Sequence, residues 1–253
     1  VNAIYQNDPE KDIAAAFTEG FESIPLLSNL PIFKDITKYI PRANWRIDWR
    51  GLEKIGFISG FAKSVSLNHA YVSSYSEGWK VDPDGKRQVQ TQRINYGFSP
   101  LAGLNITFDD LWGGNLTGSL KYSTKTSYDL GIATRNITES FNRDINFTAS
   151  FAKSGFSLPL FGLDLKNDIE MSLSYTSAQN SVVIFEMDNF TEEGKPQDGT
   201  TRTIIEPRIK YTLSSKVTLS IFYKRTAVEP EGASRIPPTT TNEAGLDVHI
   251  SIQ

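Results

Sequence analysis

The chain of 253 residues contains no cysteine, which excludes disulfide bonds and thiolate chemistry. It also lacks any run of 18 apolar residues, so no transmembrane helix is expected. Basic residues do not outnumber acidic ones, and a net charge of -3 with mixed signs argues against nucleic acid as a partner. Neither a Met nor a basic region nor an apolar region opens the sequence, so a secretory signal is expected to be missing or already removed.

Alternation of polar and apolar residues is the dominant pattern of the sequence. Between residues 116 and 133 every even position up to Ile132 is apolar, aromatic, small or Thr, and every odd position up to Gly131 is polar or Gly. Because side chains alternate between the two faces of a strand, this stretch predicts one long strand with one apolar and one polar face. Strands in soluble domains are usually about 5–6 residues long.

Similar alternation predicts about nine strands and an all-β fold. A bulge or kink is expected at Pro100, because proline breaks a central ladder. The strands are predicted at residues 44–50, 62–76, 89–108, 116–133, 141–151, 163–177, 205–213, 217–223 and 246–252.

The predicted connections alternate between short and long. Short ones lie at 109–115, 154–162 and Ser214–Ser215, whereas long polar ones lie at 77–88, 187–202 and 229–242. Barrels of the bacterial outer membrane have short periplasmic turns and long extracellular loops. Strand length and loop asymmetry together predict an antiparallel transmembrane β-barrel segment in the cell outer membrane.

The alternation assigns candidate residues to the two sides of the barrel wall, with the lipid bilayer as one partner. Side chains in the apolar period should face lipid, and side chains in the polar period should face the lumen. The lipid-facing candidates are Leu120, Tyr122, Phe147, Leu173, Leu219 and Ile221. The lumen-facing candidates are Lys121, Lys125, Asp168, Glu170, Arg208 and Lys210.

Two regions are predicted, residues 1–42 and residues 43–253. The first is expected to be a cap or plug-like segment with a short helix, which has Asp8 as its N-cap, Pro9 in its first turn and Gly20 just after its end. The second is the barrel segment. Nine strands would leave the first and last running parallel, whereas single-chain bacterial barrels have even strand numbers. We therefore expect the chain to be the C-terminal part of a larger barrel, whose remainder belongs to the same or another chain.

Three motifs resemble the C-terminal region of the SprA/Sov family. They are PRANWRIDWRGLEK at 41–54, SLNHAYVSSYS at 66–76 and FSPLAGLNITF at 98–108. Proteins of this family are outer-membrane translocons of the type 9 secretion system in Bacteroidota and relatives. The resemblance implies a very large barrel that passes folded cargo proteins to the cell surface, with plug and shuttle proteins as partners.

Two other interpretations remain open at this point. The chain could form a small porin-like barrel, closed alone or by oligomerisation, or a soluble all-β module that binds carbohydrate. An enzyme is not expected, because neither histidine belongs to a nucleophile or metal-binding motif. No cofactor and no metal site are predicted.

Overall fold

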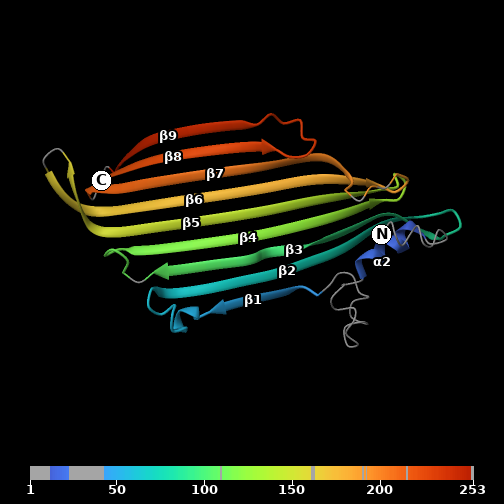
Figure 1. The fold of residues 1–253 in the computed structure, drawn as a ribbon, viewed down its shortest axis with the longest axis horizontal. Coiled ribbons are helices and arrows are strands. Elements are labelled where there is room, and N and C mark those ends of the chain that lie inside the picture. The colour runs from blue at the N-terminus through green and yellow to red at the C-terminus, as the bar shows by residue number, and fades with distance from the viewer. Residues whose placement is uncertain are drawn as a thin grey trace.

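The computed structural model describes residues 12–22, 43–108, 110–160, 163–189, 191, 193–214 and 216–251, without the side chains of 158–160 and 163–166. In this part of the chain, nine strands form one antiparallel sheet in sequence order (Figure 1). The predicted all-β fold with about nine antiparallel strands is confirmed. The helix α2 (Ile13–Glu22) packs on the sheet. Among the described residues, no helix is long and apolar enough to span a membrane.

The strands are long. A short 3-10 turn, η2 (Leu52–Lys54), lies between the first two. The strands are β1 (Trp45–Arg50), β2 (Ala62–Val81), β3 (Arg87–Phe108), β4 (Asn115–Gly131), β5 (Asn136–Leu160), β6 (Leu163–Glu186), β7 (Lys195–Ser214), β8 (Val217–Pro230) and β9 (Thr239–Ile250).

The connections are shorter than the sequence predicted. The expected loops at 187–202 and 229–242 shrink to 187–194 and 231–238, and most of the expected linker at 154–162 belongs to β5. The predicted boundaries were wrong because backbone ladder bonds continue past the point where side-chain alternation stops. The expected asymmetry in loop length is therefore weak. Ser215 of the predicted Ser214–Ser215 turn lies outside the described residues.

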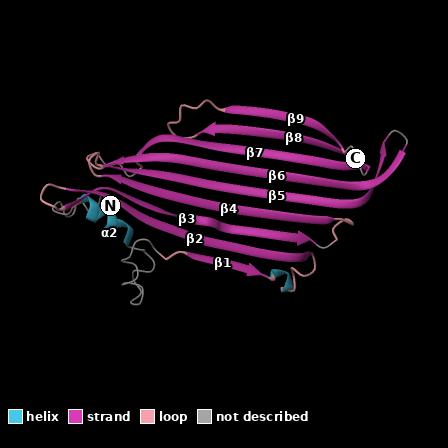
Figure 2. Ribbon diagram, turned by 180° about the vertical axis from the view of Figure 1, so that it is seen from behind, coloured by secondary structure: helices cyan, strands magenta, loops and turns pink. Residues whose placement is uncertain are grey.

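The sheet has two distinct ends. The α2 end, at the right of Figure 1, carries α2 and the connections 82–86, 132–135, 187–194 and 231–238. The C-terminal end, at the left, carries the turns at 51–61 and 109–114, the β5–β6 turn and the β7–β8 turn. Figure 2 shows the same arrangement from behind, with β1 and β9 at opposite edges.

A bulge interrupts the ladder of β3 at the place where the sequence predicted one. The register with β4 shifts between Phe98 and Ala102, and the register with β2 shifts between Asn68 and Tyr71. The peptide bond between Ser99 and Pro100 is cis. Glycine at position 97 permits close packing there, since a Cβ would lie 2.1 Å from the carbonyl oxygen of Thr124.

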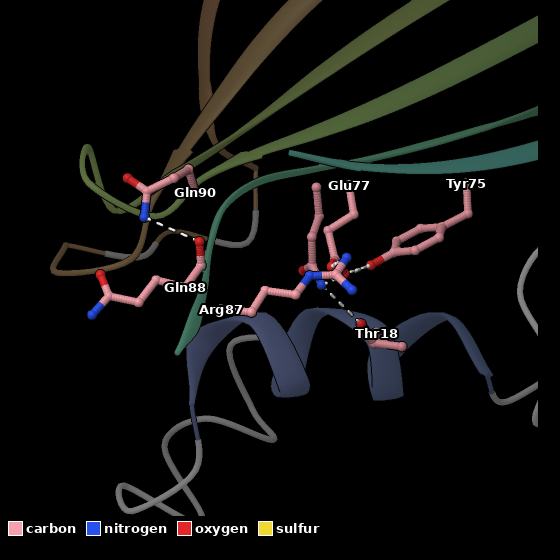
Figure 3. A network of polar contacts seen from close by, with 7 residues as sticks. Thr18, Tyr75, Glu77, Arg87, Gln88 and Gln90 are labelled. Atoms are coloured by element: carbon pink, nitrogen blue, oxygen red, sulfur yellow. Dashed lines mark hydrogen bonds and ion pairs between the residues drawn. The ribbon is translucent and has the colours of Figure 1, made fainter. Parts of the chain in front are cut away.

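The helix α2 forms a buried cluster with the sheet. Ile13 and Phe17 pack against Ile94, Leu130 and Ile137 at the α2 end of the sheet. Polar contacts extend this interface from the helix to the edge of the β2–β3 hairpin (Figure 3). In that network the Gln92 amide donates to Thr18 Oγ1 at 3.2 Å and to Tyr75 Oη at 2.9 Å; Tyr75 and Arg87 in turn donate to Glu77, each at 2.5 Å.

The helix does not stop where the sequence predicted. It continues through Gly20 to Glu22, because Phe21 in its last turn packs on Phe17 and on the ring of Tyr128. The predicted cap residues Asp8 and Pro9 lie outside the described residues. Asp12 accepts a bond from the backbone N–H of Ala14 at 3.4 Å instead.

Candidate functional site

The sheet has an apolar face, defined as the face that contains Leu120, and a polar face, defined as the face that contains Lys121. In an antiparallel ladder, directly paired residues lie on the same face. One row of pairs on the apolar face joins Trp49, Leu67, Leu104, Leu120, Phe147, Tyr175, Ile205, Arg225 and Asn242, from β1 to β9.

The register places the two sets of predicted residues on opposite faces. All six lipid-facing candidates lie on the apolar face: Leu120, Tyr122, Phe147, Leu173, Leu219 and Ile221. All six lumen-facing candidates lie on the polar face, either by direct pairing or by alternation along β6: Lys121, Lys125, Asp168, Glu170, Arg208 and Lys210. Which face meets lipid and which meets a lumen stays a prediction.

The apolar face is uncovered over most of its area. The accessible surface of the chain is 16408 Å², whereas a compact soluble protein of this mass would expose roughly 11,000 Å². No second sheet packs on this face in the described part of the chain. Its exposed large apolar residues are Trp45, Ile47, Trp49, Leu120, Met171, Ile205, Ile209, Ile221, Tyr223, Leu246, Val248 and Ile250.

These exposed residues form a band that runs diagonally across the strands. The row that contains Leu120 is apolar from β1 to β7 but polar at Arg225 on β8 and Asn242 on β9. On β1 the exposed residues centre on Ile47, two residues from Trp49 toward the α2 end, and the row of Trp49 reaches Asn242 on β9. On β9 they centre on Val248, six residues from Asn242 toward the C-terminal end, so the two centres differ by eight residues.

The slope of the band has a simple geometric meaning. Eight residues over the eight steps from β1 to β9 is one residue per strand. A rise of about 3.3 Å per residue and a strand spacing of about 4.8 Å convert this slope into an angle of about 35°. Strands of membrane barrels tilt by about 35–45°. If strands tilted in this way crossed a flat bilayer, the lipid-facing segment of each strand would be shifted by about one residue relative to that of its neighbour.

The α2 end of the apolar face is polar or covered. One row between the band and the α2 end consists of Arg143, Gln179 and Thr201, which occupy the apolar period of β5, β6 and β7. Gln179 and Thr201 donate hydrogen bonds to the carboxylate of Glu231, and with nearby Arg143 they lower its pKa. Sequence reasoning missed Arg143, although a charge at an apolar position was a visible signal that the band ends there.

The polar face carries both hydroxyl or amide groups and charges. On β2 to β6 it is rich in Ser, Thr and Asn, with cross-strand bonds such as Ser119 Oγ to Thr148 Oγ1 at 2.7 Å, and it also includes the ion pair of Arg93 with Asp129. Other hydroxyl groups bond to asparagine side chains, as Ser74 and Ser66 do with Asn95 and Asn105. A hollow of about 590 Å³ crosses it and is lined by residues that include Ser66, Asn105 and Thr117.

On β6 to β9 the predicted polar residues form ion pairs. Lys210 Nζ lies 3.7 Å from Glu170 Oε2. Arg208 lies 3.0 Å from Glu206 and 3.9 Å from Asp247, and its guanidinium sits over the ring of Phe222. Lys121, Lys125 and Asp168 form no ion pair with another described residue. In the described strands this face thus carries charges of both signs rather than a ring of one sign.

Both edges of the sheet are open in the part of the chain that the structure describes. β1 pairs only with β2, and β9 pairs only with β8. The two edge strands run in the same direction, because the seven strands between them alternate. Joining them directly would require a parallel pair. Unpaired backbone donors and acceptors in lipid cost several kcal/mol each, roughly, so edges at membrane depth need a partner.

Within the described residues, no group of three or more His, Asp or Glu is placed to hold a metal ion. Of the two histidines, His69 lies among the rings of Trp45 and Phe98 on the apolar face, and its Nδ1 is 2.6 Å from the carbonyl oxygen of Leu101. That the chain is not an enzyme stays a prediction. A scan against protein-family models found no matching family, and a search of curated proteins found no significant match.

Proposed function

We propose that the sheet is a C-terminal part of the wall of an outer-membrane protein-translocation channel. The apolar face contacts lipid, and the polar face lines the conduit. The resemblance of residues 41–54, 66–76 and 98–108 to the SprA/Sov family supports a translocon of the type 9 secretion system in particular. Its cargo, plug and shuttle partners belong to the same proposal.

The observation that carries the proposal is the diagonal band of exposed apolar residues. Nothing in the described part of the chain covers these residues, and their one-residue-per-strand slope matches the tilt of strands in membrane barrels. An uncovered apolar surface of this extent requires an apolar neighbour, since monomeric soluble proteins rarely expose patches beyond a few hundred Å².

The open edges support a part of a larger barrel rather than a complete one. Within the described residues each edge strand lacks a partner on one side, and the two run parallel. A preceding strand that pairs with β1, and a distant strand that pairs with β9, would satisfy both edges with antiparallel ladders. The balanced charges and hydroxyl groups of the polar face suit a wide conduit that releases its cargo, since an ion-selective pore uses a ring of one sign.

The orientation of the sheet in the membrane is inferred from the end at which the strands extend beyond the apolar band. At the α2 end, β2 to β6 continue for several residues beyond it, into the region that α2 covers. We place this end outside the cell and the C-terminal end in the periplasm. A tag inserted at 234–235 should be detected on intact cells, and a tag beside Lys216 only after the outer membrane is breached. The reverse result would invert the orientation.

Single cysteines test the assignment of the faces, and the natural chain has no cysteine to interfere. Neighbouring positions form matched pairs: Leu120 with Lys121, Ser172 with Leu173, and Ser220 with Ile221. In the native membrane, an impermeant thiol reagent should label the cysteine at 121, 172 and 220 and spare the one at 120, 173 and 221. Preferential labelling of the second set would reject the assignment.

Two further measurements separate the alternatives. The purified protein should aggregate without detergent; a monomer that stays in aqueous solution would support the carbohydrate-binding module and reject the channel. The 253-residue chain refolded alone in detergent should give no discrete conductance. A heat-modifiable monomer with single-channel currents would support the small porin-like barrel.

A further inference from the structure

A basic side chain stands on the apolar face at the C-terminal end of the sheet. Lys153 of β5 pairs with Ile169 of β6, one row beyond Phe151, and so shares the face of the apolar band. Its ammonium donates to the backbone carbonyl oxygen of Trp112 at 2.9 Å. It forms no ion pair with any described carboxylate. An ammonium has three donors, so the cation keeps its charge and spare donors at the border of an apolar surface.

The turn beside it holds a tryptophan in the open. Trp112 has φ +56°, a left-handed conformation that is rare for a bulky residue, and the residue is 76% exposed. The turn packs tightly on β5, since a Cβ at Gly114 would lie 2.6 Å from the ring of Phe151. The indole contacts the ring of Phe151 edge-on, with centroids 6.3 Å apart. Trp112 thus presents an exposed indole from the same residue whose carbonyl oxygen accepts the bond from Lys153.

An exposed indole beside a cation at the edge of an apolar band has the chemistry of a lipid headgroup contact. Indole rings favour the membrane–water interface, where the ring packs on acyl chains and the N–H meets polar groups. A lysine there binds phosphate as a point charge. We propose that Lys153 and Trp112 bind the phosphate of a phospholipid headgroup in the leaflet at the C-terminal end; this site rests on the proposed membrane function.

Native mass spectrometry of the purified protein in a non-ionic detergent tests the site, with dioleoylphosphatidylglycerol as the probe. The unsubstituted protein should bind one lipid more tightly than the rest. Lys153→Met should weaken that binding about fivefold, the contribution typical of one basic residue at an anionic lipid surface. Lys153→Arg should restore it, and Trp112→Ala should weaken it. Lys224→Met, the same change in charge on the polar face, should leave it unchanged.

Each other outcome has a definite meaning. Equal lipid binding by the unsubstituted protein, Lys153→Met and Lys224→Met would overturn the site while leaving the membrane function intact. Equal binding of diacylglycerol, which has no phosphate, would also overturn it, as would displacement of the lipid by inorganic phosphate at matched concentration. If every variant binds no lipid and stays soluble without detergent, the proposed function fails together with the site. Circular dichroism of each variant checks that the sheet has folded.

Discussion

Phe21 of α2 and Tyr128 of β4 lie with their ring centroids 5.0 Å apart, so the last turn of the helix is held directly on the sheet. Phe17, one turn earlier, is fully buried and belongs to the same cluster. The helix therefore rests on the apolar face beyond the diagonal band, where the proposed function places the wall outside the bilayer.

Replacing Phe17 should release the helix without unfolding the sheet. Phe17→Ala removes a fully buried ring, a change that typically costs about 3–5 kcal/mol, and here that loss falls on the docking of one helix. Hydrogen exchange of the α2 amides should accelerate while β4 to β8 stay protected. Ala15→Ser, at an exposed position of the same helix, should leave hydrogen exchange unchanged in both α2 and the sheet. Simultaneous loss of protection throughout the sheet would show that α2 is essential to the fold.

A charge on the apolar face should oppose insertion. Leu173 lies near the middle of the band on β6, so Leu173→Arg should cost roughly 2–4 kcal/mol in a bilayer. Ser172→Arg places the same charge on the polar face and should cost much less. Unfolding of the two variants in lipid vesicles with urea measures the difference. Equal stability of the two variants would contradict the assignment of lipid to the apolar face.

The connection at 231–238 should loosen in acid. The folded state holds the pKa of Glu231 below its ordinary value of 4.5, chiefly through hydrogen bonds from Thr201 and Gln179. The resulting stabilisation is complete above about pH 4.5 and is lost as the pH falls through the lower folded-state pKa. Hydrogen exchange of 231–238, corrected for intrinsic rates, should therefore rise below pH 4.5.

Glu231→Gln supplies the matched test of this acid response. The amide keeps the size of the side chain but lacks the charge, so the connection should already exchange faster at pH 7 and respond little to acid. Glu243→Gln on β9 is the control and should leave the connection protected. An acid response that survives Glu231→Gln would assign it to another group.

Removing the last strand should prevent assembly. Deleting 246–253 takes away Leu246 and Val248, which pair with Ile221 and Leu219, and exposes the backbone of β8 to lipid. The truncated protein should fail to appear in the outer-membrane fraction, and cargo should accumulate in the periplasm. A deletion of 234–236 in the neighbouring connection serves as the control. Normal export by the truncated protein would refute a role for β9 in closing the wall.

The division into two faces could be predicted from sequence because it is a local property. Leu120 and Lys121 are neighbours, and alternation alone puts them on opposite faces of whatever strand they occupy. Pro100 predicted its bulge for an equally local reason, the missing N–H of proline. Each of these predictions needed only a few consecutive residues.

Other features could not be predicted, because they depend on residues far apart in the chain. The diagonal of the band is visible only once Trp49 and Asn242 are known to share a row. The docking of α2 depends on Leu130 and Ile137, which lie more than a hundred residues away from the helix. The ion pair of Glu170 and Lys210 likewise required the register of β6 and β7.

The slope of the apolar band constrains any barrel to which this sheet could belong. A closed barrel has a fixed stagger, the shear, which is the distance along a strand between the points that meet after one circuit. If the slope of one residue per strand holds around the whole wall, the shear in residues equals the number of strands. Strand number and shear must then change together. Adding or removing a two-strand hairpin would therefore change the shear by about two residues, and the edges at β1 and β9 would have to shift along each other by that amount.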